Sequence, residues 1–193
     1  MTITINGTSG ITLPSGSAAV GTTDSQTMTN KTIGSGYAGS TVTAGTAVAS
    51  TSGTSIDFTG IPSWVKRITV MFNGVSTNGT SPLLVQLGSG SATTTGYTSG
   101  ASGSSGSLAT TTSTAGFILN YASVAAGTSN GVIPFTNVSG NIWVSSGVLN
   151  LYTTGNNMSG GTVTLSGTLD RVRITTVNGT DTFDAGSINI LYE

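Results

Sequence analysis

The fold is decided by residues 64–72, which read Trp-Val-Lys-Arg-Ile-Thr-Val-Met-Phe. Side chains two positions apart in an extended strand point to the same side, and this stretch places a set of apolar residues in that phase. The residues expected in the core are Trp64, Ile68, Val70 and Phe72. Asn-Gly pairs follow at Asn73 and Asn78, and residues 83–87 form a second apolar run. Because Asn-Gly favours tight turns between strands, the pattern predicts a β-hairpin as the central unit.

The overall composition limits the class of protein. The chain has 193 residues, which is enough for one globular domain with an appendage, and only 6% of them are charged. A typical soluble domain has about 25% charged residues. No apolar run approaches the roughly 18 residues that a spanning helix needs, so we expect no membrane insertion. A signal peptide begins with a basic segment followed by an apolar run, and the N-terminus does not show this pattern, so we expect no signal peptide.

The absence of two residue types removes most catalytic chemistry. The sequence has no Cys and no His, so it offers no thiolate nucleophile, disulfide, imidazole base or imidazole metal ligand. The net charge is −1, and the five basic residues are spread over the chain, which argues against nucleic acid as a partner. We therefore expect a protein that is not an enzyme and that needs no cofactor.

The composition favours strands throughout. Thr and Val are abundant, while the strong helix formers are scarce. Further strand candidates lie at residues 116–122, 132–138, 141–152, 162–177 and 187–192, and Pro134 places the second of them at a sheet edge. Residues 99–107 are so rich in Ser and Gly that they predict a loop. Eight or nine short strands predict an all-β antiparallel sandwich, with a jelly roll favoured over other Greek-key orders.

Residues 1–50 differ from the rest, because they contain neither Trp nor Phe. Such a segment cannot bury enough surface alone to offset its ordering entropy, so it is either a flexible tail or an extended segment held by other copies or by a larger assembly. The second interpretation is favoured, because apolar residues are spaced like contact points. These residues are Ile3, Ile5, Ile11, Leu13 and Ile33. We therefore divide the chain into an anchoring or oligomerisation segment, 1–50, and a β-sandwich domain, 51–193.

Residues 24–33 read Asp-Ser-Gln-Thr-Met-Thr-Asn-Lys-Thr-Ile. This stretch resembles a motif of bacteriophage tail-fibre and other virion appendage proteins, Asp-Thr-Gln-Thr-Leu-Thr-Asn-Lys-Thr-Ile, and departs from it at Ser25 and Met28. Residues 58–79 also resemble a segment of phage fibre-like proteins. The resemblance implies a virion surface protein made in the host cytoplasm, usually homotrimeric. It also implies that Asp24, Asn30 and Lys31 belong to the anchoring segment.

Three motifs could carry chemistry or contacts. Residues 127–131, Gly-Thr-Ser-Asn-Gly, match a nucleophile elbow, but no His could activate Ser129, so the motif predicts a turn. Asp181 and Asp184 are weak candidates for a cation site or a carboxylate pair, and are more typical of a turn. Arg171 and Arg173 share a strand face and form either a surface ion-pair ladder or a partner contact.

The aromatic residues offer a possible carbohydrate surface. Trp143 is out of phase with Ile142 and Val144, so we expect it to be exposed and available for a partner. Together these features predict a phage fibre, tail fibre, head fibre or capsid-decorating spike that docks on capsid or tail and adsorbs to host surface polysaccharide. The alternatives are a decoration or collar protein that binds no receptor, a carbohydrate-active enzyme and a secreted adhesin module.

Overall fold

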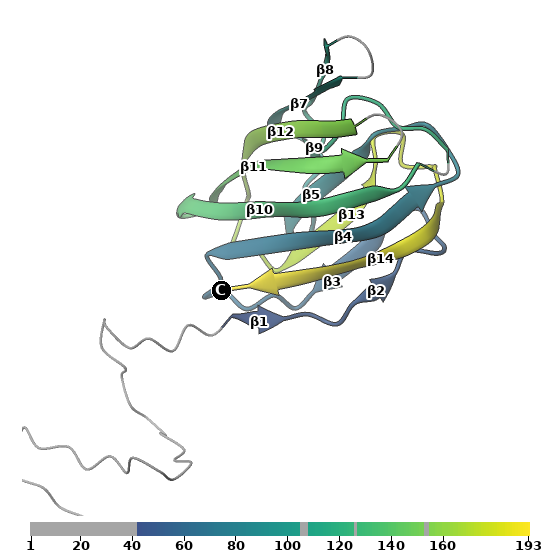
Figure 1. Cartoon of the computed structure of the whole chain (residues 1–193). Helices are drawn as coiled ribbons and strands as arrows, with labels where there is room; N and C mark the ends of the chain where they lie inside the picture. The colour runs from purple at the N-terminus through teal and green to yellow at the C-terminus, as the bar shows by residue number, and fades with distance from the viewer. Residues whose placement is uncertain (1–41, 105–107, 126, 153–154) are drawn as a thin grey trace, which may run out of the picture. The chain divides into compact units, whose positions relative to one another are not determined.

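The computed structural model describes residues 42–104, 108–125, 127–152 and 155–193, which form fourteen strands and no helix (Figure 1). The strands make a nine-stranded sheet, called here the broad sheet, and a five-stranded sheet, called the small sheet. All strand pairings are antiparallel, and the two sheets pack together. The chain is therefore an all-β antiparallel sandwich, as its Thr- and Val-rich composition predicts.

The broad sheet runs in the order β1 (Thr43–Ala44), β14 (Phe183–Tyr192), β4 (Arg67–Thr77), β10 (Ser129–Ser139), β11 (Ile142–Leu151), β12 (Gly155–Thr164), β7 (Thr98–Ser104) and β8 (Leu108–Ser113). A further short strand, β2 (Val48–Ala49), also pairs with β14. The small sheet runs in the order β3 (Ile56–Thr59), β13 (Arg171–Thr176), β5 (Leu83–Ser89) and β6 (Ser91–Ala92), and β9 (Phe117–Ile118) pairs with β5.

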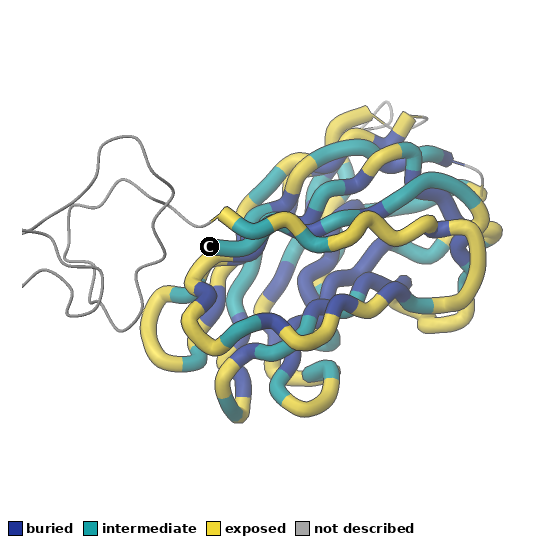
Figure 2. The backbone as a smooth tube through the Cα atoms, turned by 90° about the horizontal axis from the view of Figure 1, so that it is seen from below, coloured by how far each residue is buried: buried dark blue, intermediate teal, exposed yellow. Residues whose placement is uncertain are grey.

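The core lies between the two sheets. Ile68, Val70 and Phe72 point into it from β4, and Figure 2 shows the buried segments gathered between the two layers. An aromatic group stands at its centre, where Phe117 makes edge contacts with Tyr97 and Phe135 at ring-centroid distances of 5.2 and 5.1 Å. Edge contacts of this kind add to the stabilisation that burial provides.

The predicted hairpin is wrong, although both of its strands exist. β4 and β5 belong to different sheets, since β4 pairs with β10 and β14 while β5 pairs with β13. The chain between them therefore crosses the sandwich. Each strand has an inward apolar face, so packing them across the core buries both faces, whereas a hairpin would place them side by side. The first Asn-Gly pair lies inside β4, where Gly74 has a φ of 63°.

A bulge bends β14 beside that position. The register between β14 and β4 shifts around Ala185, and Gly186 has a φ of 92°. A Cβ atom at residue 186 would overlap the backbone of Gly74, so only glycine allows the two strands to approach here.

Two further predictions need correction. Pro134 lies in β10, an interior strand between β4 and β11, and not at an edge. The pairing between β10 and β11 passes from Val132 to Phe135 without it, so the missing N–H is tolerated locally. The broad sheet also begins before residue 51, because β1 and β2 pair with β14.

The order of strands agrees with a sandwich in which successive strands cross between sheets, as from β3 to β4 to β5 and from β13 to β14. In contrast, β10, β11 and β12 form a consecutive meander within one sheet. The jelly-roll subtype stays a prediction. So do the proposed anchoring residues, which lie outside the described residues: Ile3, Ile5, Ile11, Leu13, Asp24, Asn30, Lys31 and Ile33.

Candidate interaction surfaces

Of the two predicted carboxylates, only that of Asp181 organises a turn. The Asp181 carboxylate accepts hydrogen bonds from the backbone N–H of Ser81, at 2.9 Å, and from the side-chain amide of Asn178, at 2.6 Å. Asp184 instead accepts a hydrogen bond from the Ser76 hydroxyl. Within the described ranges, no three acidic, His or Cys side chains gather as a metal site would require. The turn interpretation therefore fits Asp181, whereas Asp184 lies in β14 and links that strand to β4.

Ser129 occupies a position that does not suit a nucleophile. It is buried at the first residue of β10, and the chain continues from it as a strand. A nucleophile elbow needs a strand followed by a helix, with the hydroxyl exposed at the turn between them. The turn predicted for residues 127–131 is therefore wrong from Ser129 onward, where the chain is already in β10.

The two arginines of β13 are held by carboxylates of the same chain. Arg173 lies opposite Asp57 in the β13–β3 ladder, with Nε 2.7 Å from Oδ1 and Nη2 3.0 Å from Oδ2. Arg171 donates from Nε to Asp170 Oδ1 at 2.7 Å, and this hydrogen bond lowers the pKa of the Asp170 carboxyl. The same two partnerships raise the pKa values of both guanidinium groups. The ion-pair ladder is thus the arrangement found.

The expected positions of the two tryptophans are reversed. Trp64 is 49% exposed and Trp143 only 3%. Strand β4 begins at Arg67, and a turn closed by the hydrogen bond from Val65 N–H to Pro62 O precedes it, so the alternation does not extend back to Trp64. In β11 the phase is right but the side is not: Trp143 faces the core while Ile142 and Val144 face outward.

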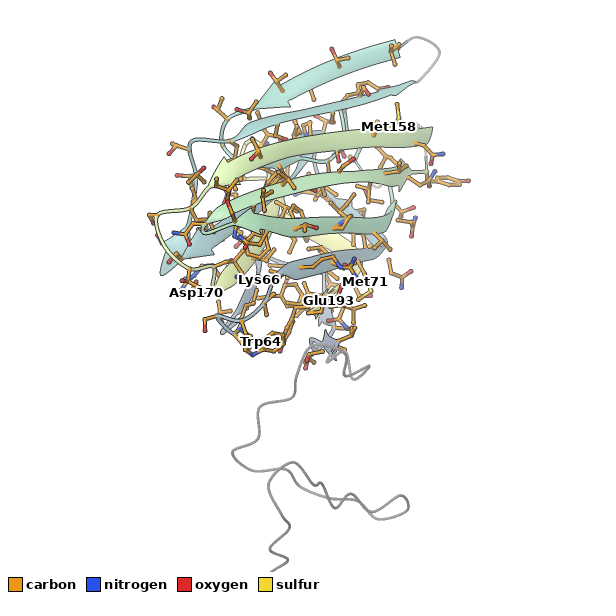
Figure 3. All side chains as sticks on the ribbon, turned by 90° about the vertical axis from the view of Figure 1, so that its left-hand side faces the viewer. Trp64, Lys66, Met71, Met158, Asp170 and Glu193 are labelled. Atoms are coloured by element: carbon orange, nitrogen blue, oxygen red, sulfur yellow. The ribbon has the colours of Figure 1, made fainter. Side chains whose placement is uncertain are left out.

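Trp64 contributes to an aromatic patch near the start of β4. Its ring centroid lies 6.0 Å from that of Tyr192, with the planes tilted by 49°. Close by, the side chains of Arg67 and Glu193 form an ion pair, and the backbone of Glu193 bonds to that of Arg67. Figure 3 labels Trp64 and Glu193 in this region, away from Met158. The two tilted rings do not form one flat platform for a sugar.

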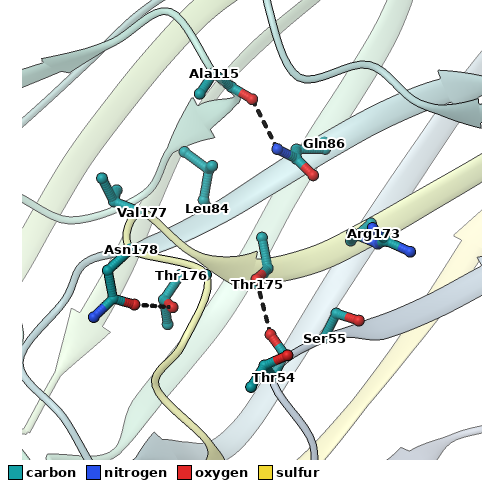
Figure 4. Close-up of a pocket in the computed structure, with 11 residues that line it drawn as sticks. Thr54, Ser55, Leu84, Gln86, Ala115, Arg173, Thr175, Thr176, Val177 and Asn178 are labelled. Atoms are coloured by element: carbon teal, nitrogen blue, oxygen red, sulfur yellow. Dashed lines mark hydrogen bonds between the residues drawn. The ribbon is translucent and has the colours of Figure 1, made fainter.

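A polar pocket of about 250 Å³ opens on the small sheet (Figure 4). Several of its side chains already have partners within the chain. Gln86 donates to the carbonyl of Ala115 at 2.9 Å, and Thr175 donates to the carbonyl of Thr54 at 2.8 Å. No aromatic residue lines the pocket. Its hydroxyl and amide groups could contact a polar ligand, but it lacks the ring on which a sugar would stack.

The outward face of the broad sheet is different in kind. Four residues at one register level, Met71, Val132, Val148 and Met158, follow one another across β4, β10, β11 and β12. Val132, Val148 and Met158 are 53, 49 and 58% exposed. This set is called here the apolar row. Residues that lie opposite one another on neighbouring strands touch on the sheet face, so the row forms one apolar strip.

Three of the four strands that carry this row, β10, β11 and β12, contain no charged residue, and on β4 the single charge is Arg67 at its first position. The sequence contains no Asp, Glu, Lys, Arg or His from residue 68 to residue 169, so β7, β8, β10, β11 and β12 are all without charge. The charged residues of the described ranges lie in 57–67 and 170–193. This charge-free stretch is visible in the sequence, but the low total charge alone does not reveal it.

Comparison with family models, with curated proteins and with solved structures found no match. Among the described residues, none forms a helix with the length and apolar character that crossing a membrane requires. The assignment of a function therefore rests on the sequence and on the surfaces described above.

Proposed function

We propose that this chain is a non-enzymatic structural protein of a bacteriophage virion, either a fibre or a capsid-decorating spike. Its N-terminal region docks on capsid or tail, copies of the chain associate, and the β-sandwich is presented on the particle surface. The observation that carries this proposal is the wide uncharged sheet face with its apolar row. Such a face suits a component whose surface is covered by neighbouring protein.

Two further observations support the proposal. Residues 24–33 resemble the motif of virion appendage proteins, and residues 58–79 resemble a fibre-protein segment. In addition, the carboxylates that a carbohydrate-active enzyme would need for catalysis already have partners within the chain. Asp57 and Asp170 are paired with arginines, and Asp181 holds a turn.

Adsorption to host surface polysaccharide is the second part of the proposal. The half-exposed Trp64, with the partly buried Tyr192 beside it, supplies aromatic surface, and the pocket on the small sheet supplies hydroxyl and amide groups. The alternative is a decoration or collar protein without a receptor. The pocket favours this alternative, because the polar side chains that line the pocket are largely bonded within the chain and no aromatic ring lines it.

The first test is to locate the chain on particles. Immunogold electron microscopy with antibodies against the full chain is carried out on particles released by cells that carry the gene. Label at the particle surface is expected, and particles from a strain lacking the gene serve as the control. Label found only on free protein, with bare particles, contradicts the proposal.

The second test separates adhesion from a purely structural role. Purified full-length chain is added to host cells before the particles. A reduction in particle adsorption that disappears in a Trp64→Ala variant indicates receptor binding through the aromatic patch. Unchanged adsorption, together with label on the particles, indicates the decoration alternative.

A further inference from the structure

We propose that the outward face of β10, β11 and β12 is the surface through which copies of this chain bind one another. This inference rests on the proposed function in one respect, because self-association is part of it. It goes further by assigning the contact to a particular face, with the apolar row at its centre.

The geometry of the face supports a flat contact. Val132 lies opposite Val148, and Val148 lies opposite Met158, so the strip crosses the strands at right angles without a gap. Neighbouring strands are about 4.8 Å apart, and the four strands from β4 to β12 therefore give a strip about 14 Å long. Ile142 and Val144, on the same side of β11, extend the apolar surface along that strand.

The charge pattern identifies the occupant. A charged side chain pressed against this face would lose its hydration and meet no opposite charge, which is unfavourable. The partner surface must therefore be as free of charge as the face itself. Within the described residues, the same face of a second copy meets this requirement. The small sheet and the loop of residues 177–184 do not meet it, because they carry Asp57, Arg171, Arg173 and Asp181.

The edge of the sheet offers a competing contact. Strand β8, Leu-Ala-Thr-Thr-Thr-Ser, ends the broad sheet and carries neither Lys nor Pro, the residues that commonly block edge pairing. At the other end, β1 and β2 have two residues each. Copies could join through β8 instead of through the apolar row, so the experiment must separate the two contacts.

The test uses light scattering and sedimentation of the full chain over a range of concentrations. The variant Val148→Asp is expected to raise the dissociation constant at least about 100-fold, because association would bury the introduced carboxylate without a partner. Val177→Asp is the matched control, since Val177 is 47% exposed and lies outside the face, after β13. It should leave the dissociation constant unchanged. Circular dichroism and the melting temperature establish that both variants are folded, and Met158→Lys repeats the test on another strand.

Each remaining outcome decides against the face. A wild-type chain that stays monomeric at all concentrations overturns the inference. So does an assembly that survives both Val148→Asp and Met158→Lys. An assembly lost only in Thr110→Lys assigns the contact to the β8 edge. The proposed function fails separately: particles without label contradict it even where Val148→Asp abolishes self-association.

Discussion

The small sheet and the broad sheet meet their surroundings in opposite ways. On the small sheet, Arg171 and Arg173 stand outward and are paired with carboxylates of the same chain. On the broad sheet, five strands expose Val, Met, Thr and Ser and carry no charge. The inner faces of both sheets are apolar and share one core. The shared apolar core between the sheets therefore stabilises the fold, while the two outward faces determine what the domain can contact.

The largest effect is expected from Trp143, on the inner face of the broad sheet. Trp143→Ala should lower the free energy of unfolding by about 3–5 kcal/mol, because it leaves a cavity in the core. Trp64→Ala should change it by less than about 1 kcal/mol, since that ring is half exposed. Urea unfolding followed by circular dichroism measures both. Equal effects would mean that the two rings are buried alike.

The next effect concerns a hydrogen bond that ties the two sheets together. Tyr97 precedes β7 of the broad sheet, and its buried hydroxyl accepts from the N–H of Leu87 in β5, at 2.9 Å, and donates to the Leu87 carbonyl. That carbonyl also accepts a bond from the Thr93 N–H. Tyr97→Phe therefore leaves chiefly one buried N–H without a partner and should cost about 1–3 kcal/mol in urea unfolding. No measurable loss would indicate that water reaches the site.

The same phenol gives a dependence on pH. Burial raises the pKa of Tyr97 above its usual value, which is near 10. As the pH rises through about 10, the unfolded chain releases this proton while the folded chain keeps it, so the free energy of unfolding falls. Urea midpoints at pH 8 and pH 11 measure the fall. Tyr97→Phe should show a smaller fall, and an identical one would assign it to other groups.

A smaller effect is expected on the charged side. Asp57→Asn removes the ion pair with Arg173, whose side chains are 34 and 40% exposed. Exposed pairs contribute about 0–1 kcal/mol, so the unfolding free energy should fall by no more than that. The difference between wild type and variant should shrink in 1 M salt. A larger loss that resists salt would show that the pair is shielded from solvent.

The smallest effect on folding is expected at the apolar row. Val132→Thr keeps the shape of the side chain and replaces a methyl group by a hydroxyl on an exposed position, so the unfolding free energy of the monomer should change by less than about 0.5 kcal/mol. Dilute samples, below the concentration at which copies associate, give the measurement. A loss above 1 kcal/mol would mean that Val132 is covered within the chain.

Much of the fold could be predicted from the sequence, and the failures have physical causes. Alternation locates strands such as β4 and β14 but does not say which sheet a strand joins, so the predicted pairing of β4 with β5 is wrong. Residues 99–107 predict a loop, yet residues 98–104 form β7. Small side chains suffice there, because β7 pairs with β12 and β8 on both sides and Ala101 packs against Ile118 and Leu84.

The surfaces were harder to predict than the strands. In β11 both faces carry apolar residues, so the phase alone could not show that Trp143 points inward. The sequence predicts an ion-pair ladder as one of two roles for Arg173, but only the register of β13 and β3 identifies Asp57 as its partner. The apolar row requires the register of four strands, which no local pattern contains.

The position of β4 has a consequence for synthesis of the chain. Its neighbours β14 and β10 both come later in the sequence, and Ser76 of β4 meets Asp184 of β14 from 108 residues away. A ribosome adding about 5–20 residues per second needs about 5–20 s to cover that distance. During this time the nascent chain holds β4 with an unpaired edge. Chains growing on neighbouring ribosomes can therefore meet before either sandwich has closed, and assembly then competes with folding.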